Sequence, residues 1–157
     1  MEKKTFLQQA KEEKHSYLLY FLIYCPLGAV APLLGQYLSG IGFSGTQVGI
    51  VTSTGTATAV VAGIFWGKCY ANTAYKRRLI ALLFLASATF AILTLRTTAF
   101  WWYVVLYGAM YAFQGPVHGL CDSFMMDGGR NFPIVRAWGA LGYSVSVYAA
   151  GNYAEVH

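Results

Sequence analysis

Long runs of uncharged, mostly apolar residues constrain this chain more than any other feature of its sequence. Each run has 17 to 22 residues, which is close to the about 20 that a helix needs to cross a bilayer. The five runs are Tyr17–Leu38, Val48–Trp66, Leu79–Leu95, Phe100–Leu120 and Trp138–Ala154. A helix is expected in each, because a helix pairs its own backbone polar groups and lipid offers them no partner. The sequence therefore predicts an all-α integral membrane protein with five transmembrane helices.

The composition agrees with this reading. Of the 157 residues, 57% are hydrophobic and 11% are charged, whereas soluble domains have roughly 45–50% apolar and about 25% charged residues. A soluble enzyme, a disordered tail and a disulfide-rich secreted domain are all poor fits. The first apolar run has 22 residues, which is too long for the apolar core of a signal peptide. We therefore expect a tail over 1–16 and a membrane domain over 17–157.

The positive charges predict the orientation of the chain in the membrane. Ten of the 11 Lys and Arg residues lie in the N-terminal tail and in the second and fourth loops. The first loop, Ser39–Gln47, has none, and the third has only Arg96. Cytoplasmic loops carry the excess of basic residues, so we expect a cytoplasmic N-terminus and location in the plasma membrane. Because the charge follows this alternation, the net charge of +5 does not indicate a nucleic-acid partner.

Rows of small residues at a spacing of three or four indicate close helix packing. The rows are Gly55, Ala59, Gly63 and Gly67; Gly108, Ala112, Gly115 and Gly119; and Gly142, Ser146 and Ala150. Small side chains let the backbones of membrane helices approach each other. We accordingly expect Gly63→Leu to disturb packing more than Val61→Leu. Such smooth faces also suit helices that slide during transport.

An acid and a base flank the predicted loop Cys121–Val135. Asp122 follows the fourth run, and Arg136 precedes the fifth. Both could solvate themselves among lipid headgroups, or they could face an aqueous cavity as a substrate-binding or proton-coupling pair. Tyr143 lies seven residues after Arg136, so the two share a helical face. A guanidinium and an aromatic ring on one wall suit a polyhydroxylated or ring-shaped ligand.

No other residues form a recognisable chemical site. Cys25, Cys69 and Cys121 are scattered, and no second pair joins His118 and Cys121 at a spacing typical of zinc ligands. No nucleophile or phosphate-binding motif has supporting spacing. We expect no metal, no cofactor and no catalytic residue, so the chain is not predicted to be an enzyme.

The stretch from Asn131 to Tyr143 resembles the entry to the fifth helix in the major facilitator superfamily. The branch it resembles contains the lactose permease and the nucleoside symporters. The matching positions are Arg136, Trp138, Gly139, Gly142 and Tyr143, with Pro116 and Asp122 on the preceding helix. The resemblance implies that Asp122 and Arg136 contact substrate and that Tyr143 stacks on a sugar ring. It also implies that this chain corresponds to most of the N-terminal six-helix half of the fold.

A second resemblance lies between the second and third runs. The superfamily has glycine, an acid and a basic cluster there, and uses the loop as a conformational latch. In this chain Gly67 opens the segment and Lys76, Arg77 and Arg78 close it. The acid is missing, with Ala71 or Asn72 at its place. The resemblance therefore implies a conformational loop of which only the basic half is present.

These observations favour secondary active transport of a small polar solute, such as a sugar or a nucleoside. Coupling to protons and alternating access follow from the resemblance. The partners implied are the solute, protons, the lipid bilayer and the missing C-terminal half of a permease, because five spans cannot build two gates around a central site. The alternative is a small non-catalytic membrane subunit that packs with partner helices. An integral membrane enzyme is the third and least favoured hypothesis.

Overall fold

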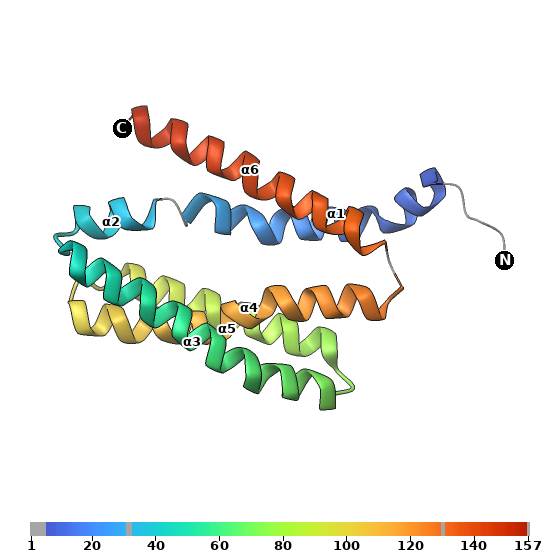
Figure 1. Cartoon of the computed structure of the whole chain (residues 1–157), viewed down its shortest axis with the longest axis horizontal. Helices are drawn as coiled ribbons and strands as arrows, with labels where there is room; N and C mark the ends of the chain where they lie inside the picture. Colours follow the sequence, from blue (N-terminus) through green and yellow to red (C-terminus); the bar gives the residue numbers. More distant parts are fainter. Residues whose placement is uncertain (1–5, 31–32, 130, 157) are drawn as a thin grey trace. The chain divides into compact units, whose positions relative to one another are not determined.

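The computed structural model describes residues 6–30, 33–129 and 131–156. Within these ranges the chain forms six helices and no strand, which confirms the all-α prediction (Figure 1). The helices are α1 (Phe6–Val30), α2 (Leu34–Gly40), α3 (Gly45–Asn72), α4 (Lys76–Leu95), α5 (Phe100–Asp127) and α6 (Phe132–Val156).

The described residues of the predicted apolar runs lie almost entirely in helices, but most helices extend beyond the runs. The run Tyr17–Leu38 is divided between α1 and α2, and Pro32 lies outside the described residues. The other four runs each fall inside one helix that extends beyond the run. The 28 residues of α3 and of α5 span about 42 Å each. Hydropathy marks the apolar part of a helix, whereas backbone hydrogen bonds continue until a cap or turn ends them.

Two helices, α3 and α4, are each long and apolar enough to cross a membrane, and Lys14–Val30 with Leu34–Gly40 would add a third as one broken span. The number of five spans stays a prediction. Large aliphatic side chains on α3 and α4 are nevertheless exposed, among them Val61 (69%) and Leu85 (66%). Such outward-facing apolar surface is expected of helices that contact lipid.

Local capping determines where α3 begins. The Ser44 hydroxyl accepts a hydrogen bond from the Gln47 backbone N–H (3.4 Å), and the Gln47 side-chain oxygen accepts one from the Ser44 N–H (2.9 Å). This reciprocal capping box satisfies N–H groups that the first helical turn leaves unpaired. The helix therefore begins inside the segment predicted as the first loop, Ser39–Gln47.

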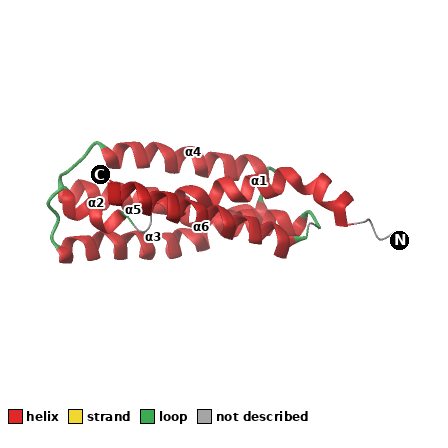
Figure 2. Cartoon of the chain, turned by 90° about the horizontal axis from the view of Figure 1, so that it is seen from above, coloured by secondary structure: helices red, strands yellow, loops and turns green. Residues whose placement is uncertain are grey.

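The chain divides into two compact units, which are described separately. One contains α1 and α6, and these two helices lie side by side (Figures 1 and 2). The other extends from Leu38 to Met125. In this second unit the ring of Phe113 on α5 is stacked on Phe90 of α4 (5.6 Å between centroids) and is 5.9 Å from Trp66 of α3. Phe113 thus joins α5 to both neighbouring helices.

The rows of small residues form helix contacts over part of their length. A β-carbon at Gly55 would lie 2.6 Å from Cε1 of Tyr107, and one at Gly115 would overlap Ala59. Toward the end of the row, a β-carbon at Gly63 or Gly67 would have no neighbour within 4 Å among the described residues. The expectation that Gly63→Leu disturbs packing more than Val61→Leu therefore stays a prediction. Packed helices cross at an angle, so a straight row touches its partner over a limited length.

Candidate functional site

Arg136 and Tyr143 both lie on α6 with exposed side chains. Asn131 precedes the helix and accepts a hydrogen bond from the Val135 N–H through its backbone oxygen (3.1 Å). Pro133 occupies the first turn, where its missing N–H costs no intrahelical hydrogen bond. The Arg136 guanidinium carbon lies 5.8 Å from the centroid of the Phe132 ring. Tyr143 is 38% exposed.

The neighbouring glycines of α6 bring its backbone onto α1. A β-carbon at Gly142 would overlap the carbonyl oxygen of Phe21, and one at Gly28 of α1 would overlap the carbonyl oxygen of Tyr143. The Cys25 thiol donates to the Gly142 carbonyl oxygen over 3.6 Å. At this crossing the two backbones touch with almost no side-chain atoms between them. The position of Arg136 and Tyr143 is therefore tied to α1.

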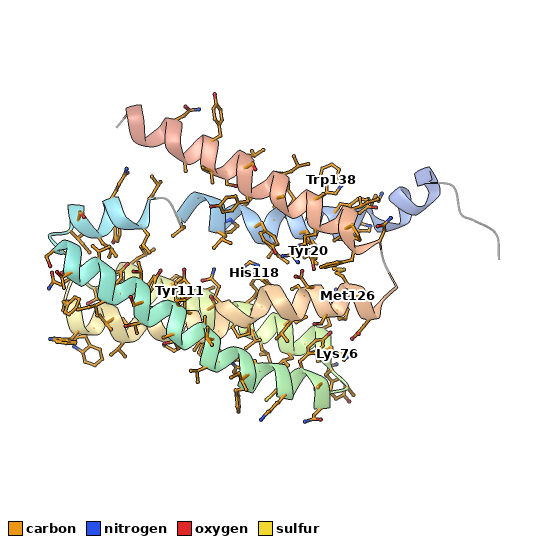
Figure 3. The ribbon with its side chains drawn as sticks, viewed as in Figure 1. Tyr20, Lys76, Tyr111, His118, Met126 and Trp138 are labelled. Carbon is orange, nitrogen blue, oxygen red and sulfur yellow. The ribbon has the colours of Figure 1, made fainter. Side chains whose placement is uncertain are left out.

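The contacts advance along both helices in the same order. Tyr17 stacks on Trp138 (5.9 Å between centroids, 15° between planes), and further along Gly28 approaches Ser146. Figure 3 shows Trp138 on α6 close to the start of that helix. The two helices thus run in the same direction, as the first and fifth spans of the predicted topology would.

Tyr24 on α1 was not anticipated as a neighbour of this face. A β-carbon at Gly139 would lie 2.8 Å from Cδ2 of Tyr24, so the ring packs directly on the glycine. At about 100° per residue, Arg136 and Tyr143 lie within about 60° of Gly139 and on the side away from Gly142. Tyr24 therefore lies at one edge of the α1–α6 contact, and this edge is the one nearest to Arg136 and Tyr143.

A sequence signal for Tyr24 does exist. Tyr17, Tyr20 and Tyr24 recur at intervals of three and four residues, which places them along one stripe of a helix. The rings of Tyr20 and Tyr24 are 6.1 Å apart and stacked. Because the chain has 12 tyrosines, this stripe can be recognised as a packing surface only when the glycines of α6 are known to lie against it.

Trp138 lies on the opposite side of the crossing from Arg136 and Tyr143. It is 200° around the helix from Arg136 at about 100° per residue, and its ring is taken up by Tyr17. Of the residues expected on or beside the helical face of Arg136, Gly139 and Gly142 form the contact with α1. Trp138 packs beyond them, so its contacts are those of a structural residue.

Asp122 lies within α5 rather than in a loop. The helix continues to Asp127, so the predicted loop Cys121–Val135 is reduced to the few residues before Phe132. Asp122 is half-buried, and the next residue, Ser123, donates its hydroxyl hydrogen bond to the Gly119 carbonyl oxygen (3.0 Å). Asp122 belongs to the second unit and Arg136 to the first. Their grouping in one site stays a prediction.

The expected conformational loop is also mostly helical. Gly67 lies inside α3, and Lys76, Arg77 and Arg78 form the first turn of α4. Only Thr73–Tyr75 connects the two helices. The predicted boundary was wrong because the basic residues end an apolar run without ending a helix.

Aromatic rings accompany the basic side chains of this turn. The Lys76 ammonium lies 4.7 Å from the centroid of the Tyr70 ring, and the Arg78 guanidinium carbon lies 4.9 Å from that of Tyr75 (Figure 3 labels Lys76). Cations near the N-terminus of a helix oppose its dipole. Contact with a π-face offsets part of this cost. The role of this segment as a conformational latch stays a prediction.

Comparison with known proteins identifies the group to which the chain is related. Residues 16–156 match the MFS_1 like family. The chain is 31% identical over 142 residues to a protein named maltose permease from Geobacillus stearothermophilus, and 26% identical over 138 residues to a protein named uncharacterized transporter YwbF from Bacillus subtilis (strain 168). Each alignment covers 85% of this chain and 35% of the relative. No solved structure matches significantly.

The chain thus spans about a third of the length of these relatives. Both relatives are named as permease or transporter, and neither is named as an enzyme. The family match begins at residue 16, just before the predicted first span, and extends to the end of α6. It therefore includes all five predicted spans, together with Asp122, Arg136 and Tyr143. The chain is an all-helical integral membrane protein that belongs to the MFS_1 like family of the major facilitator superfamily.

Proposed function

We propose that the chain is the N-terminal part of a secondary active transporter that carries a small polar solute across the plasma membrane. The single observation that carries this proposal is the family match over residues 16–156. The two relatives named as transporters support it. Transport by alternating access would couple the solute to protons, and the N-terminus would lie in the cytoplasm.

Arg136, Tyr143 and Tyr24 are the residues that we propose for solute contact. The guanidinium fork of Arg136 can hold two oxygen atoms at once, which matches the vicinal hydroxyls of a sugar. An aromatic ring can stack on the apolar face of a sugar or a nucleobase. Tyr24 of α1 packs on Gly139, and Tyr143 lies about one helical turn after Gly139 on α6. A ligand bound there would contact two helices that already touch through their backbones.

Asp122 would supply the acid of the site, either as an acceptor for solute hydroxyls or as a carrier of the coupling proton. An ionisable residue within a membrane helix is costly and is most often retained for function. Asp122 is half-buried on α5, two residues after the fourth apolar run ends, which supports this role. Gly67 and the basic turn Lys76–Arg78 would take part in conformational change between the two halves of the transporter.

The remainder of the transporter would come from the C-terminal half, which this chain lacks. The chain aligns to 35% of each relative, and a site between two halves needs both of them. Sugars and nucleosides are the solutes that the proposed contacts suit. Since one relative is named maltose permease, maltose is the first solute to test.

Uptake by the full-length gene product tests the proposal. The gene is sequenced beyond the codon for His157 and expressed in a strain without its own sugar uptake. Accumulation of labelled maltose or of a labelled nucleoside, abolished by a protonophore, is expected. The absence of uptake for every sugar and nucleoside tested would contradict the proposal. A stop codon after His157, with a stable short protein, would favour a non-catalytic membrane subunit instead.

A further inference from the structure

Three cations at the turn between α3 and α4 lack the acidic neighbours that usually accompany such residues. We call Lys68, Arg77 and Arg78 the α3–α4 basic patch. All three are exposed, and the sequence contains no Asp or Glu from residue 14 to residue 121. Among the described residues, none of the three forms an ion pair. The positive charge of the patch is therefore available to an anion from outside the chain.

The local structure places these three charges near one turn. The connection Thr73–Tyr75 is only three residues long, and the Tyr75 N–H donates to the Thr73 hydroxyl (3.2 Å). Lys68 lies about one turn before the end of α3, and Arg77 and Arg78 lie in the first turn of α4. Both helix ends thus present their cations at the same end of the unit.

Tyr75 prepares one of these cations to bind an anion. Tyr75 is 64% exposed, and the Arg78 guanidinium carbon lies 4.9 Å from the centroid of its ring. A guanidinium held by an aromatic ring keeps its planar fork of N–H donors, which matches the oxygens of a phosphate. Tyr75 also provides no side-chain hydrogen bond to the start of α4. Exposed tyrosine beside arginine is typical of the membrane–water interface.

The position of the patch decides which anion it meets. It lies where α3 and α4 meet, and these are the two helices that are each apolar enough to cross a membrane. The ends of such helices lie among lipid headgroups, where anionic lipids attract basic residues. We propose that the α3–α4 basic patch binds the headgroup phosphate of acidic phospholipids, with Arg77 and Arg78 as the main donors. This inference depends on membrane insertion and not on the proposed transport.

Lipid binding by the purified chain tests the proposal. The ratio of bound phosphatidylglycerol to bound phosphatidylcholine is measured by native mass spectrometry from mixed micelles. The double variant R77Q/R78Q is expected to lower the affinity for phosphatidylglycerol roughly 25-fold. This corresponds to about five-fold, or about 1 kcal/mol, for each charge removed at an anionic surface. The double variant R77K/R78K, which keeps the charge, is expected to retain most of the binding.

Arg96 provides the matched control, because it is an exposed arginine at the other end of α4. R96Q should leave the lipid ratio unchanged. If R96Q lowers binding as much as R77Q/R78Q, or if R77Q/R78Q binds like the wild type, the patch is not the site. Displacement of the lipid by millimolar inorganic phosphate would show that the patch takes a free anion, which also overturns the proposal.

If the double variant does not fold, the single variant R77Q is used, with an expected loss of about five-fold. If the wild-type chain binds phosphatidylglycerol no better than phosphatidylcholine, the proposal is overturned without any variant. The outcome is independent of solute uptake, since no solute is present in the measurement. A transporter that fails to carry sugars could still show the lipid preference, and the reverse holds as well.

Discussion

Arg136 combines exposure with a fixed place on α6, beside glycines that contact the α1 backbone. We predict that Arg136→Lys lowers solute uptake by the full-length transporter by at least about ten-fold, while expression is unchanged. Lysine keeps the charge but offers a single mobile donor group in place of the planar fork. Uptake of labelled solute is measured together with protein level by immunoblot. Near-normal uptake would leave Arg136 as a determinant of topology only, since both side chains can reach the headgroups.

Tyr143 separates the contribution of a ring from that of a hydroxyl. We predict that Tyr143→Phe reduces uptake less than Tyr143→Ala, because stacking survives without the hydroxyl. Tyr148 is the matched control, as an exposed tyrosine of the same helix (74%). Tyr148→Ala should change uptake little. If Tyr143→Ala and Tyr148→Ala lower uptake equally, the effect comes from a general loss of aromatic surface, and Tyr143 has no specific role in solute contact.

At the scale of helices, the crossing of α1 and α6 leaves no room for a β-carbon at Gly142. We predict that Gly142→Ala destabilises the purified protein by about 1–3 kcal/mol, because the added methyl group meets backbone atoms of Phe21, which cannot rotate away. Gly63→Ala should cost nothing measurable, since its β-carbon has no neighbour within 4 Å among the described residues. Thermal unfolding in detergent compares the two variants. Equal melting temperatures would contradict the crossing.

The sequence could predict where helices occur and which faces are small, but not how far the contacts extend. Charge-free runs identify helices because lipid excludes other backbone forms. The row from Gly55 to Gly67 is uniform in sequence, yet only its first part touches α5. That limit depends on the crossing angle, which the side chains of both helices determine together. The same holds for Tyr24, whose importance depends on a glycine more than a hundred residues away.

At the scale of the whole molecule, the split of ten basic residues against one predicts the orientation in the membrane. We predict that a cysteine at Ser39 is labelled from outside intact cells by an impermeant thiol reagent. The native Cys25, Cys69 and Cys121 are replaced first. A cysteine at Ala74, which is exposed in the α3–α4 connection, serves as the control and should react only after lysis. The reverse pattern would invert the topology.

Only part of the candidate site can be predicted from the sequence. The spacing of seven residues was enough to place Arg136 and Tyr143 on one face, because helical periodicity is local. Asp122 lies in the other unit, so its relation to Arg136 depends on long-range packing that no spacing encodes. The positions of the two residues at either end of one predicted loop suggested that grouping, and the resemblance to a family implied it as well.

The short connection between α3 and α4 has a consequence for proteolysis. Lys76, Arg77 and Arg78 offer trypsin three consecutive cleavage sites, but all three lie in the first turn of α4. A protease must pull its substrate into an extended strand, and only Thr73–Tyr75 is free of helix there. We expect the folded protein in detergent to resist cutting at these residues and the heat-unfolded protein to be cut at once, as judged by mass spectrometry of the fragments. Rapid cutting of the folded protein would mean that the first turn of α4 opens readily. The short connection between α3 and α4 is thus expected to protect a basic stretch that the sequence alone marks as a trypsin site.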